Sequence, residues 1–275
     1  MREVSPERIT SRSNPLAVRV RRLRDRRSER RQEGVLLGEG PKLLQEALRW
    51  GARLEAVLFT PGVSLPGLPP QVRQVEVPES LMASLSDTKS AQGILFLAQG
   101  ELGPLPQQPS GDRYLLLDGV QDPGNVGAIW RTADAFGADG MILCNACADP
   151  WSPKTVRATM GAVFRLPVYE DTLEGAADKL SRAGIPLYAA ALTDCCQDVR
   201  QARLERAAVI IGSEGRGVSP QGLALCRGGI RIPMRGRCES LNAAVAAAVV
   251  LWEMGRAGLP GPQECGGGEL GAWQT

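Results

Sequence analysis

Residues 114–136 read YLLLDGVQDPGNVGAIWRTADAF, and this stretch decides the fold class. It opens with the continuous apolar run 114–117, which is typical of a strand buried on both faces of a parallel sheet. An acidic, glycine-containing loop follows, and the apolar spacing after the loop predicts a helix over about 126–136. A buried strand, a glycine loop and a helix in this order indicate a β-α-β unit, so we expect a parallel sheet with helices on both faces.

The rest of this half of the chain repeats the pattern. Apolar runs predict further strands, at 141–143, 187–191, 209–211 and 230–232. Helical spacing predicts helices between them, at 154–160, 174–183 and 242–255. Residues 113–258 are therefore expected to form one α/β domain with a parallel sheet.

The first hundred residues also alternate strands and helices. Strands are predicted at 35–37, 54–59, 72–77 and 94–98, and helices begin after Asn14, after Gly40 and near Leu81. This predicts a small α/β sandwich over residues 1–100. Residues 101–112, rich in Pro, Gly and Gln, are expected to be a linker, and the glycine-rich residues 259–275 a disordered tail.

Charge is distributed unevenly. Residues 1–60 hold 14 Lys and Arg against 8 Asp and Glu, although the whole chain has a net charge of only +2. The helix that follows Asn14 has a narrow apolar stripe and a wide surface of arginines. A basic segment on a near-neutral body favours a polyanionic partner, and we expect nucleic-acid contacts from Arg22, Arg26 and Arg30. The alternative is a solvated charged helix.

Composition excludes several classes of chemistry. The chain has no histidine, so Ser-His-Asp hydrolysis and histidine general-base catalysis are excluded. Seven cysteines include the C-x-x-C formed by Cys144 and Cys147, but no second such pair completes a zinc site. We expect reduced structural thiols, no metal, no membrane span and a cytoplasmic protein; a redox role for the C-x-x-C is the alternative.

Two further segments have unusual loops. Residues 210–220 read IIGSEGRGVSP and bracket Glu214 with glycines, which permit close approach of the backbone to a ligand. This is neither a dinucleotide fingerprint nor a P-loop. Residues 230–247 read IRIPMRGRCESLNAAVAA, in which Ser240 and Asn242 begin an alanine-rich helix. Such residues are usually helix caps, and the small residues favour close packing against another helix or a second subunit.

Together and in this order, the segments that begin at Asp118, Ile210 and Ile230 resemble the three motifs of the SpoU/TrmH family of SPOUT RNA methyltransferases. The resemblance covers residues 112–256 and includes KTVRATMGA at 154–162. The N-terminal region is similar to the substrate-binding domain, related to ribosomal protein L30e, that often accompanies these enzymes. The resemblance implies a deep trefoil knot, a homodimer with the active site near the subunit interface, and S-adenosylmethionine as cofactor.

The same resemblance implies methylation of a ribose 2′-hydroxyl in RNA and names the site residues. The catalytic set is Asn125, Arg131, Glu214, Ser240 and Asn242. The cofactor set is Gly212, Ile232 and Leu241, with the neighbours Leu192, Thr193 and Met234.

Of the catalytic set, Arg131 is expected to stabilise the developing alkoxide and hold a phosphate, because a guanidinium does not readily give up its proton. Glu214 would accept the proton or orient Arg131. Ribosomal RNA is the favoured substrate. Transfer RNA, methylation of a base, and a catalytically silent RNA-binding protein are the alternatives.

Overall fold

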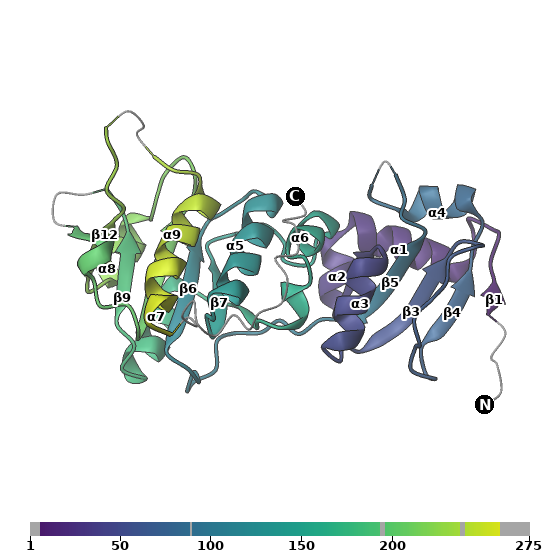
Figure 1. The fold of residues 1–275 in the computed structure, drawn as a ribbon, viewed down its shortest axis with the longest axis horizontal. Helices are drawn as coiled ribbons and strands as arrows, with labels where there is room; N and C mark the ends of the chain where they lie inside the picture. The colour runs from purple at the N-terminus through teal and green to yellow at the C-terminus, as the bar shows by residue number, and fades with distance from the viewer. Residues whose placement is uncertain (1–5, 89, 193–195, 237–239, 259–275) are drawn as a thin grey trace, which may run out of the picture.

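The computed structural model describes residues 6–88, 90–192, 196–236 and 240–258, so the predicted disordered tail lies outside the described residues. Two units lie side by side along the long axis of the molecule (Figure 1), each built on its own sheet. We call residues 6–100 the N-terminal unit and residues 113–258 the C-terminal unit. Within the described residues, no helix combines the length and the apolar content needed to cross a bilayer.

The N-terminal unit is a five-stranded mixed sheet with the order β1-β4-β3-β5-β2. Its strands are β1 (Glu7–Arg8), β2 (Val35–Glu39), β3 (Leu54–Phe59), β4 (Arg73–Glu76) and β5 (Ile94–Gln99). Its helices are α1 (Pro15–Asp25), α2 (Arg27–Glu33), α3 (Pro41–Arg49) and α4 (Glu79–Leu85). Asn14 caps α1 by accepting a hydrogen bond from the Leu16 amide, as the Asn-Pro pair predicts.

The C-terminal unit confirms the predicted α/β fold. Its seven strands are all parallel, in the order β10-β12-β9-β11-β6-β7-β8. They are β6 (Arg113–Asp118), β7 (Gly140–Cys144), β8 (Val168–Glu170), β9 (Leu187–Ala190), β10 (Gln197–Asp198), β11 (Ala207–Gly212) and β12 (Gly228–Arg231). The α-helices are α5 (Pro123–Ala135), α6 (Pro153–Ala158), α7 (Leu173–Arg182), α8 (Pro220–Leu225) and α9 (Ala243–Gly255). Three short 3₁₀ turns complete it, η1 (Ala162–Phe164), η2 (Val199–Gln201) and η3 (Arg256–Gly258). The trefoil knot stays a prediction.

The run at 114–117 is buried on both sides, as its sequence predicts. Leu115 and Leu117 face the core shared with α5 and α9, whereas Tyr114 and Leu116 face the core shared with α7. Successive side chains of a strand point to opposite faces, so a strand covered on both faces must be apolar throughout. In Figure 1, α5 and α9 lie side by side over one face of the sheet.

Two local expectations need revision. The arginine-rich helix is broken at Arg26, which is extended (φ −121°, ψ 117°), so α1 and α2 are separate helices with different directions. The expected linker also contributes to the core, because Leu105 is buried among residues of β6, β7 and α7. Its amide donates a hydrogen bond to Asp171 at 3.1 Å, which holds the segment against the C-terminal unit.

Candidate active site

The three unusual segments meet at the carboxyl edge of the parallel sheet. Strands β6 and β11 are neighbours, and their last residues, Asp118 and Gly212, are register partners. After Gly212 the chain turns back on itself, and Ser213 and Gly217 exchange two backbone hydrogen bonds (3.2 and 2.9 Å). A Cβ atom on Gly212 would lie 1.9 Å from the Gly217 carbonyl carbon, so only glycine fits there.

Three predicted catalytic residues form one hydrogen-bonded cluster. The Asn125 side chain donates a hydrogen bond to Glu214, and the Asn242 side chain donates one to the amide oxygen of Asn125 at 3.2 Å. The three residues come from different segments: the first turn of α5, the turn after β11 and the start of α9. Glu214 and Asn242 are exposed and Asn125 is half-buried, so a substrate can reach the cluster.

Of the predicted catalytic residues, Asn242 caps a helix, whereas Asn125 and Ser240 do not. Asp122, rather than Asn125, is the N-cap of α5, since its carboxylate accepts the Asn125 amide at 2.9 Å. Asn242 is the N-cap of α9, accepting the amides of Ala244 and Val245. The capping interpretation therefore holds for Asn242 in addition to its bond to Asn125. It does not hold for Ser240, which lies two residues before the cap and is exposed.

Arg131 stands apart from this cluster. It lies on α5, about two turns from the start of the helix, and its side chain is exposed. Within the described part of the chain, the Arg131 side chain forms no ion pair or hydrogen bond, so the expected contact with Glu214 is not formed. An exposed cation without a partner among the described residues, on the same helix as Asn125, is available for an anionic or developing negative charge.

A cavity of about 470 Å³ opens beside the cluster, within the usual range for ligand sites. Glu214 and Ser240 lie on its wall, as do all the described members of the predicted cofactor set: Leu192, Gly212, Ile232, Met234 and Leu241. Thr193 lies outside the described residues. Sequence reasoning missed the small residues of the wall, which are Ala190, Ala191, Ala243 and Ala246. The Gly212 turn and these alanines leave a space for a ligand, and larger side chains at these positions would fill that space.

The residues of this cavity suit S-adenosylmethionine. Ile232 and Leu241 offer apolar contacts for a flat adenine, and the glycine-rich turn at 212–217 offers backbone groups at close range. Glu214 provides a carboxylate for a positively charged ligand. When bound, this cofactor supplies an electrophilic methyl group, and the residues named here would hold and orient it.

Asp118 is a functional candidate that the sequence analysis did not single out. It is buried, and its carboxylate accepts hydrogen bonds from the Ser219 amide and the Asn145 side chain, both at 2.7 Å. It thereby joins the end of β6 to the loop that carries Glu214. The signal was present in the sequence as an acidic residue directly after a buried apolar run.

The three arginines predicted to contact RNA do not share one environment. Arg26 is largely exposed and Arg22 is half-exposed, and their nearest acidic partner is Glu29. Arg30, however, is only 4% exposed, and its guanidinium is paired with Asp149. This burial argues against the expected RNA contact by Arg30, because the break at Arg26 turns α2 so that this side chain faces the C-terminal unit.

The C-x-x-C thiols are buried in the core. Cys147 donates hydrogen bonds to the carbonyl oxygens of Leu117 and Cys144. Burial raises the pKa of Cys147 to about 11 and raises the pKa of Cys144 further, so both thiols stay protonated at neutral pH. Among the described residues, no group of three or more His, Cys, Asp or Glu side chains is arranged to hold a metal ion.

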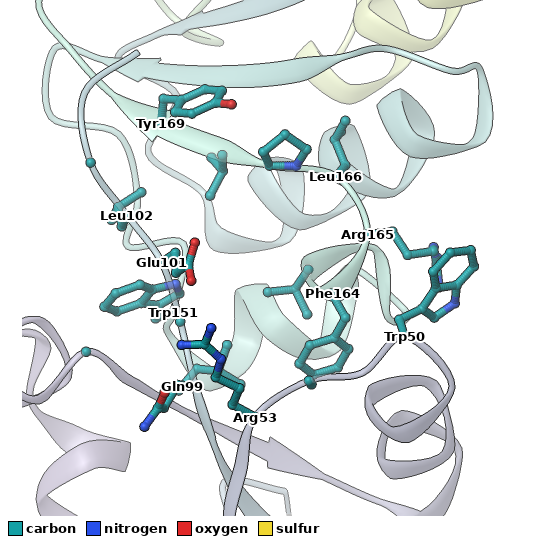
Figure 2. A pocket seen from close by; sticks show the side chains of 18 of the residues that line it. Trp50, Arg53, Gln99, Glu101, Leu102, Trp151, Phe164, Arg165, Leu166 and Tyr169 are labelled. Atoms are coloured by element: carbon teal, nitrogen blue, oxygen red, sulfur yellow. The ribbon is translucent and has the colours of Figure 1, made fainter. Parts of the chain in front are cut away.

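A second and larger cavity, of about 710 Å³, lies between the two units (Figure 2). It is lined by aromatic and charged residues that include Trp50, Arg53, Trp151 and Tyr169. None of the predicted site residues that the structure describes lines it. The smaller cavity is therefore the candidate active site, since it is the one that the Asn125–Glu214–Asn242 cluster borders.

Comparison with known proteins agrees with this geometry. The model of the SpoU rRNA Methylase family matches residues 112–252, and that of the MRM3-like substrate binding domain matches residues 14–96. The 23S rRNA (guanosine(2553)-2′-O)-methyltransferase RlmP of Bacillus subtilis is 31% identical over 229 residues, covering 83% of this chain and 91% of that protein. An uncharacterised tRNA/rRNA methyltransferase of Synechocystis is 34% identical, with 90% and 93% covered.

Solved structures give the same result. An rRNA methyltransferase from Sinorhizobium meliloti, crystallised with S-adenosylmethionine, superposes with a TM-score of 0.81 at 30% identity, covering 92% of this chain and 99% of that one. The SpoU methyltransferase AviRb from Streptomyces viridochromogenes, also with the cofactor, gives 0.80 at 26% identity, with 90% and 99% covered. With its motifs, its parallel sheet and its cavity in agreement, this chain belongs to the SpoU rRNA methylase family.

Proposed function

We propose that this protein transfers a methyl group from S-adenosylmethionine to a ribose 2′-hydroxyl of ribosomal RNA of the 23S type. The observation that carries the proposal is the Asn125–Glu214–Asn242 cluster at the edge of the 470 Å³ cavity. Arg131, whose side chain has no partner among the described residues, lies on the same helix as Asn125. The name of the Bacillus subtilis relative supports the choice of RNA and of the ribose oxygen.

The residues divide the chemical work. Glu214 is the proton acceptor for the 2′-hydroxyl, because it is an exposed carboxylate on the cavity wall. Asn125 orients that carboxylate, and Asn242 orients Asn125. Arg131 keeps its proton and stabilises the alkoxide that develops on the ribose, or holds the neighbouring phosphate. Holding the two reactants in line lowers the activation barrier further, by at most about 7–11 kcal/mol.

The two units would have separate tasks. Residues 1–100 act as the RNA-binding domain and residues 113–258 as the catalytic domain, with 101–112 between them. The match of residues 14–96 to a substrate-binding domain supports this division. Arg22 and Arg26 remain the candidate phosphate contacts because their side chains reach solvent. Ribosomal RNA fixes the expected location as the cytoplasm.

We also propose a homodimer. Helix α9 is apolar on most of its surface, and Val245 and Trp252 on it are about half exposed. Trp252 packs edge-to-face against Phe136 at the end of α5, so α5 and α9 form one continuous face. An exposed apolar face next to a site that must exclude water supports burial against a second copy.

The test is transfer of a labelled methyl group from S-adenosylmethionine to ribosomal RNA, followed by alkaline hydrolysis. A 2′-O-methyl group blocks cleavage at its own position, so we expect one resistant dinucleotide. Label released on a mononucleotide would indicate base methylation and contradict the proposal. Cofactor binding by calorimetry without transfer to ribosomal or transfer RNA would favour a catalytically silent RNA-binding protein.

A further inference from the structure

The contact between the two units combines an apolar cluster, in which Trp151 and Val156 pack against residues of the N-terminal unit, with a set of arginine–carboxylate pairs, one of which is buried. Arg30 on α2 donates from Nε to the Asp149 carboxylate at 2.8 Å, and its Nη2 lies 2.7 Å from the same oxygen. Its Nη1 donates to the carbonyl oxygens of Leu23 (2.5 Å) and Arg24 (2.9 Å) at the end of α1. Every nitrogen of this guanidinium is therefore committed to a protein partner.

Other pairs surround this one and run in both directions across the contact. Arg31 and Arg27 of the N-terminal unit bind Glu170. In the opposite direction, Arg157 binds Asp87 at 3.1 Å, and Arg165 binds Glu46. Figure 2 shows Arg165 stacked beside Trp50 at the margin of the 710 Å³ cavity, where its guanidinium lies 5.6 Å from the ring centre. These outer pairs are more exposed than Arg30 and Asp149, so each is expected to contribute less.

Asp149 is also connected to the loop that carries the active site. The preceding residue, Ala148, donates its amide to the carbonyl oxygen of Val120 at 2.9 Å, and Val120 lies between β6 and Asn125. The carbonyl oxygen of Asp149 accepts the Thr155 hydroxyl at 2.9 Å, which fixes it to α6. The turn before it contains two consecutive non-glycine residues, Asn145 and Ala146, with φ of +50° and +56°. Such strained conformations persist where the surrounding structure determines them.

We propose that Arg30 and Asp149 are a positioning pair, which docks the RNA-binding domain on the loop after β7, itself bonded to the segment before Asn125, so that bound RNA presents its ribose at one fixed place. This rests on the proposed function. The pair touches neither the cofactor cavity nor the Asn125–Glu214–Asn242 cluster. Its effect is therefore on where the RNA lies relative to Arg131 and Glu214, and a misplacement of about 1 Å can cost on the order of 100-fold in rate.

The experiment uses the full chain and four variants: Arg30→Met, Asp149→Leu, the double variant, and Arg182→Met as a control. Arg182 has a comparable pairing partner, Asp178, but it is exposed on α7 and away from the contact. Removing Arg30 leaves the Asp149 carboxylate with only Arg31, at 3.7 Å, and removing Asp149 leaves the buried Arg30 charge uncompensated, whereas replacing both by apolar side chains of similar volume can be tolerated. The double variant therefore tests whether the two units can dock through apolar contact at this place, without the two charges.

For each single variant we expect kcat/KM for RNA to fall by on the order of 10- to 100-fold. The Kd for S-adenosylmethionine, the Kd for RNA and the salt dependence of RNA binding should stay near those of the wild type. The double variant should recover most of the loss, and Arg182→Met should behave as wild type. Wild-type kcat/KM in both single variants would overturn the proposal. So would a double variant as slow as the singles, or a weaker salt dependence in Arg30→Met, which would make Arg30 an RNA contact after all.

Amide hydrogen exchange gives a second readout that needs no activity. In Arg30→Met, or in the milder Arg30→Lys if the first does not fold, we expect faster exchange at residues 119–122 and 145–149 and unchanged exchange in α7. Unchanged exchange at 119–122 and 145–149 would contradict the docking role. If the wild type methylates no RNA, the proposed function fails, and the exchange result still decides whether the pair docks the two units.

Discussion

The active-site cluster and the contact between the units are both built from polar side chains, but they differ in exposure. Glu214 and Asn242 reach solvent, and each is joined to the cluster through a single bond to Asn125. Arg30 and Asp149 are buried, and between them they bind each other, two carbonyl oxygens and a backbone amide. Polar groups that a protein leaves exposed and loosely paired remain free for a substrate, whereas buried ones must be paired to be tolerated at all.

Two arginines make the comparison sharper. Arg131 and Arg30 both lie on helices, and both are expected from sequence to meet RNA. The structure leaves Arg131 exposed and without a partner among the described residues, but it encloses Arg30 between the two units. This difference predicts that a substitution at Arg131 slows the methyl-transfer step, and that a substitution at Arg30 changes where bound RNA lies relative to the active site.

The largest expected effect is that of Arg131→Ala. It removes the only cation that we assign to the developing alkoxide, and losing one such donor typically lowers kcat by about 10²- to 10³-fold. The melting temperature should not fall, because Arg131 has no partner in the described structure. Methyl transfer under single-turnover conditions measures the effect, with circular dichroism as the control for folding. Turnover near that of the wild type would remove Arg131 from the catalytic set.

A smaller effect, divided between stability and rate, is expected at Asn242. Asn242→Ala removes both the cap of α9 and the bond to Asn125, so it should cost about 1 kcal/mol in the free energy of unfolding and slow methylation roughly fivefold. Asn242→Ser keeps a capping oxygen but is too short to reach Asn125. It should restore stability and leave methylation slow. If Asn242→Ser restores both the melting temperature and kcat, Asn242 is a helix cap and nothing more.

The smallest effect on chemistry is expected at the exposed arginines. Replacing Arg22 and Arg26 together by Gln should leave kcat unchanged and reduce the slope of log K for RNA against log salt by about 2, one for each lost phosphate contact. Binding titrations at several salt concentrations measure this, with Arg182→Gln as the control. An unchanged slope would mean that α1 and the start of α2 are a solvated surface and not an RNA contact.

Much of the fold could be predicted because its signals are local. The strands of the C-terminal sheet were found from apolar runs, except β8 and β10, which have only three and two residues. Short edge strands carry too few side chains to show a pattern. The break at Arg26 was missed for a related reason, since nothing in its neighbours favours an extended residue over a helical one.

The candidate site was predicted in part. The residues of the three motifs do meet, and the described cofactor candidates do line one cavity. The role of Asp118 could not be predicted, because only the structure shows that its carboxylate is buried and bonded to Ser219, 101 residues later. The cavity alanines could not be predicted either, because an alanine in the sequence does not indicate whether it packs against a neighbour or lines a cavity.

The amino-acid sequence by itself determined the order of strands and helices, the three motif segments and the residues available for chemistry, because those properties depend on near neighbours and on side-chain type. The tertiary structure alone decided which polar groups are enclosed. Arg30 and Asp149 are 119 residues apart, and the pairing of two such charges depends on packing that brings distant surfaces together and removes water from between them. No local pattern encodes that, so two arginines that are both expected from sequence to meet RNA acquire different environments.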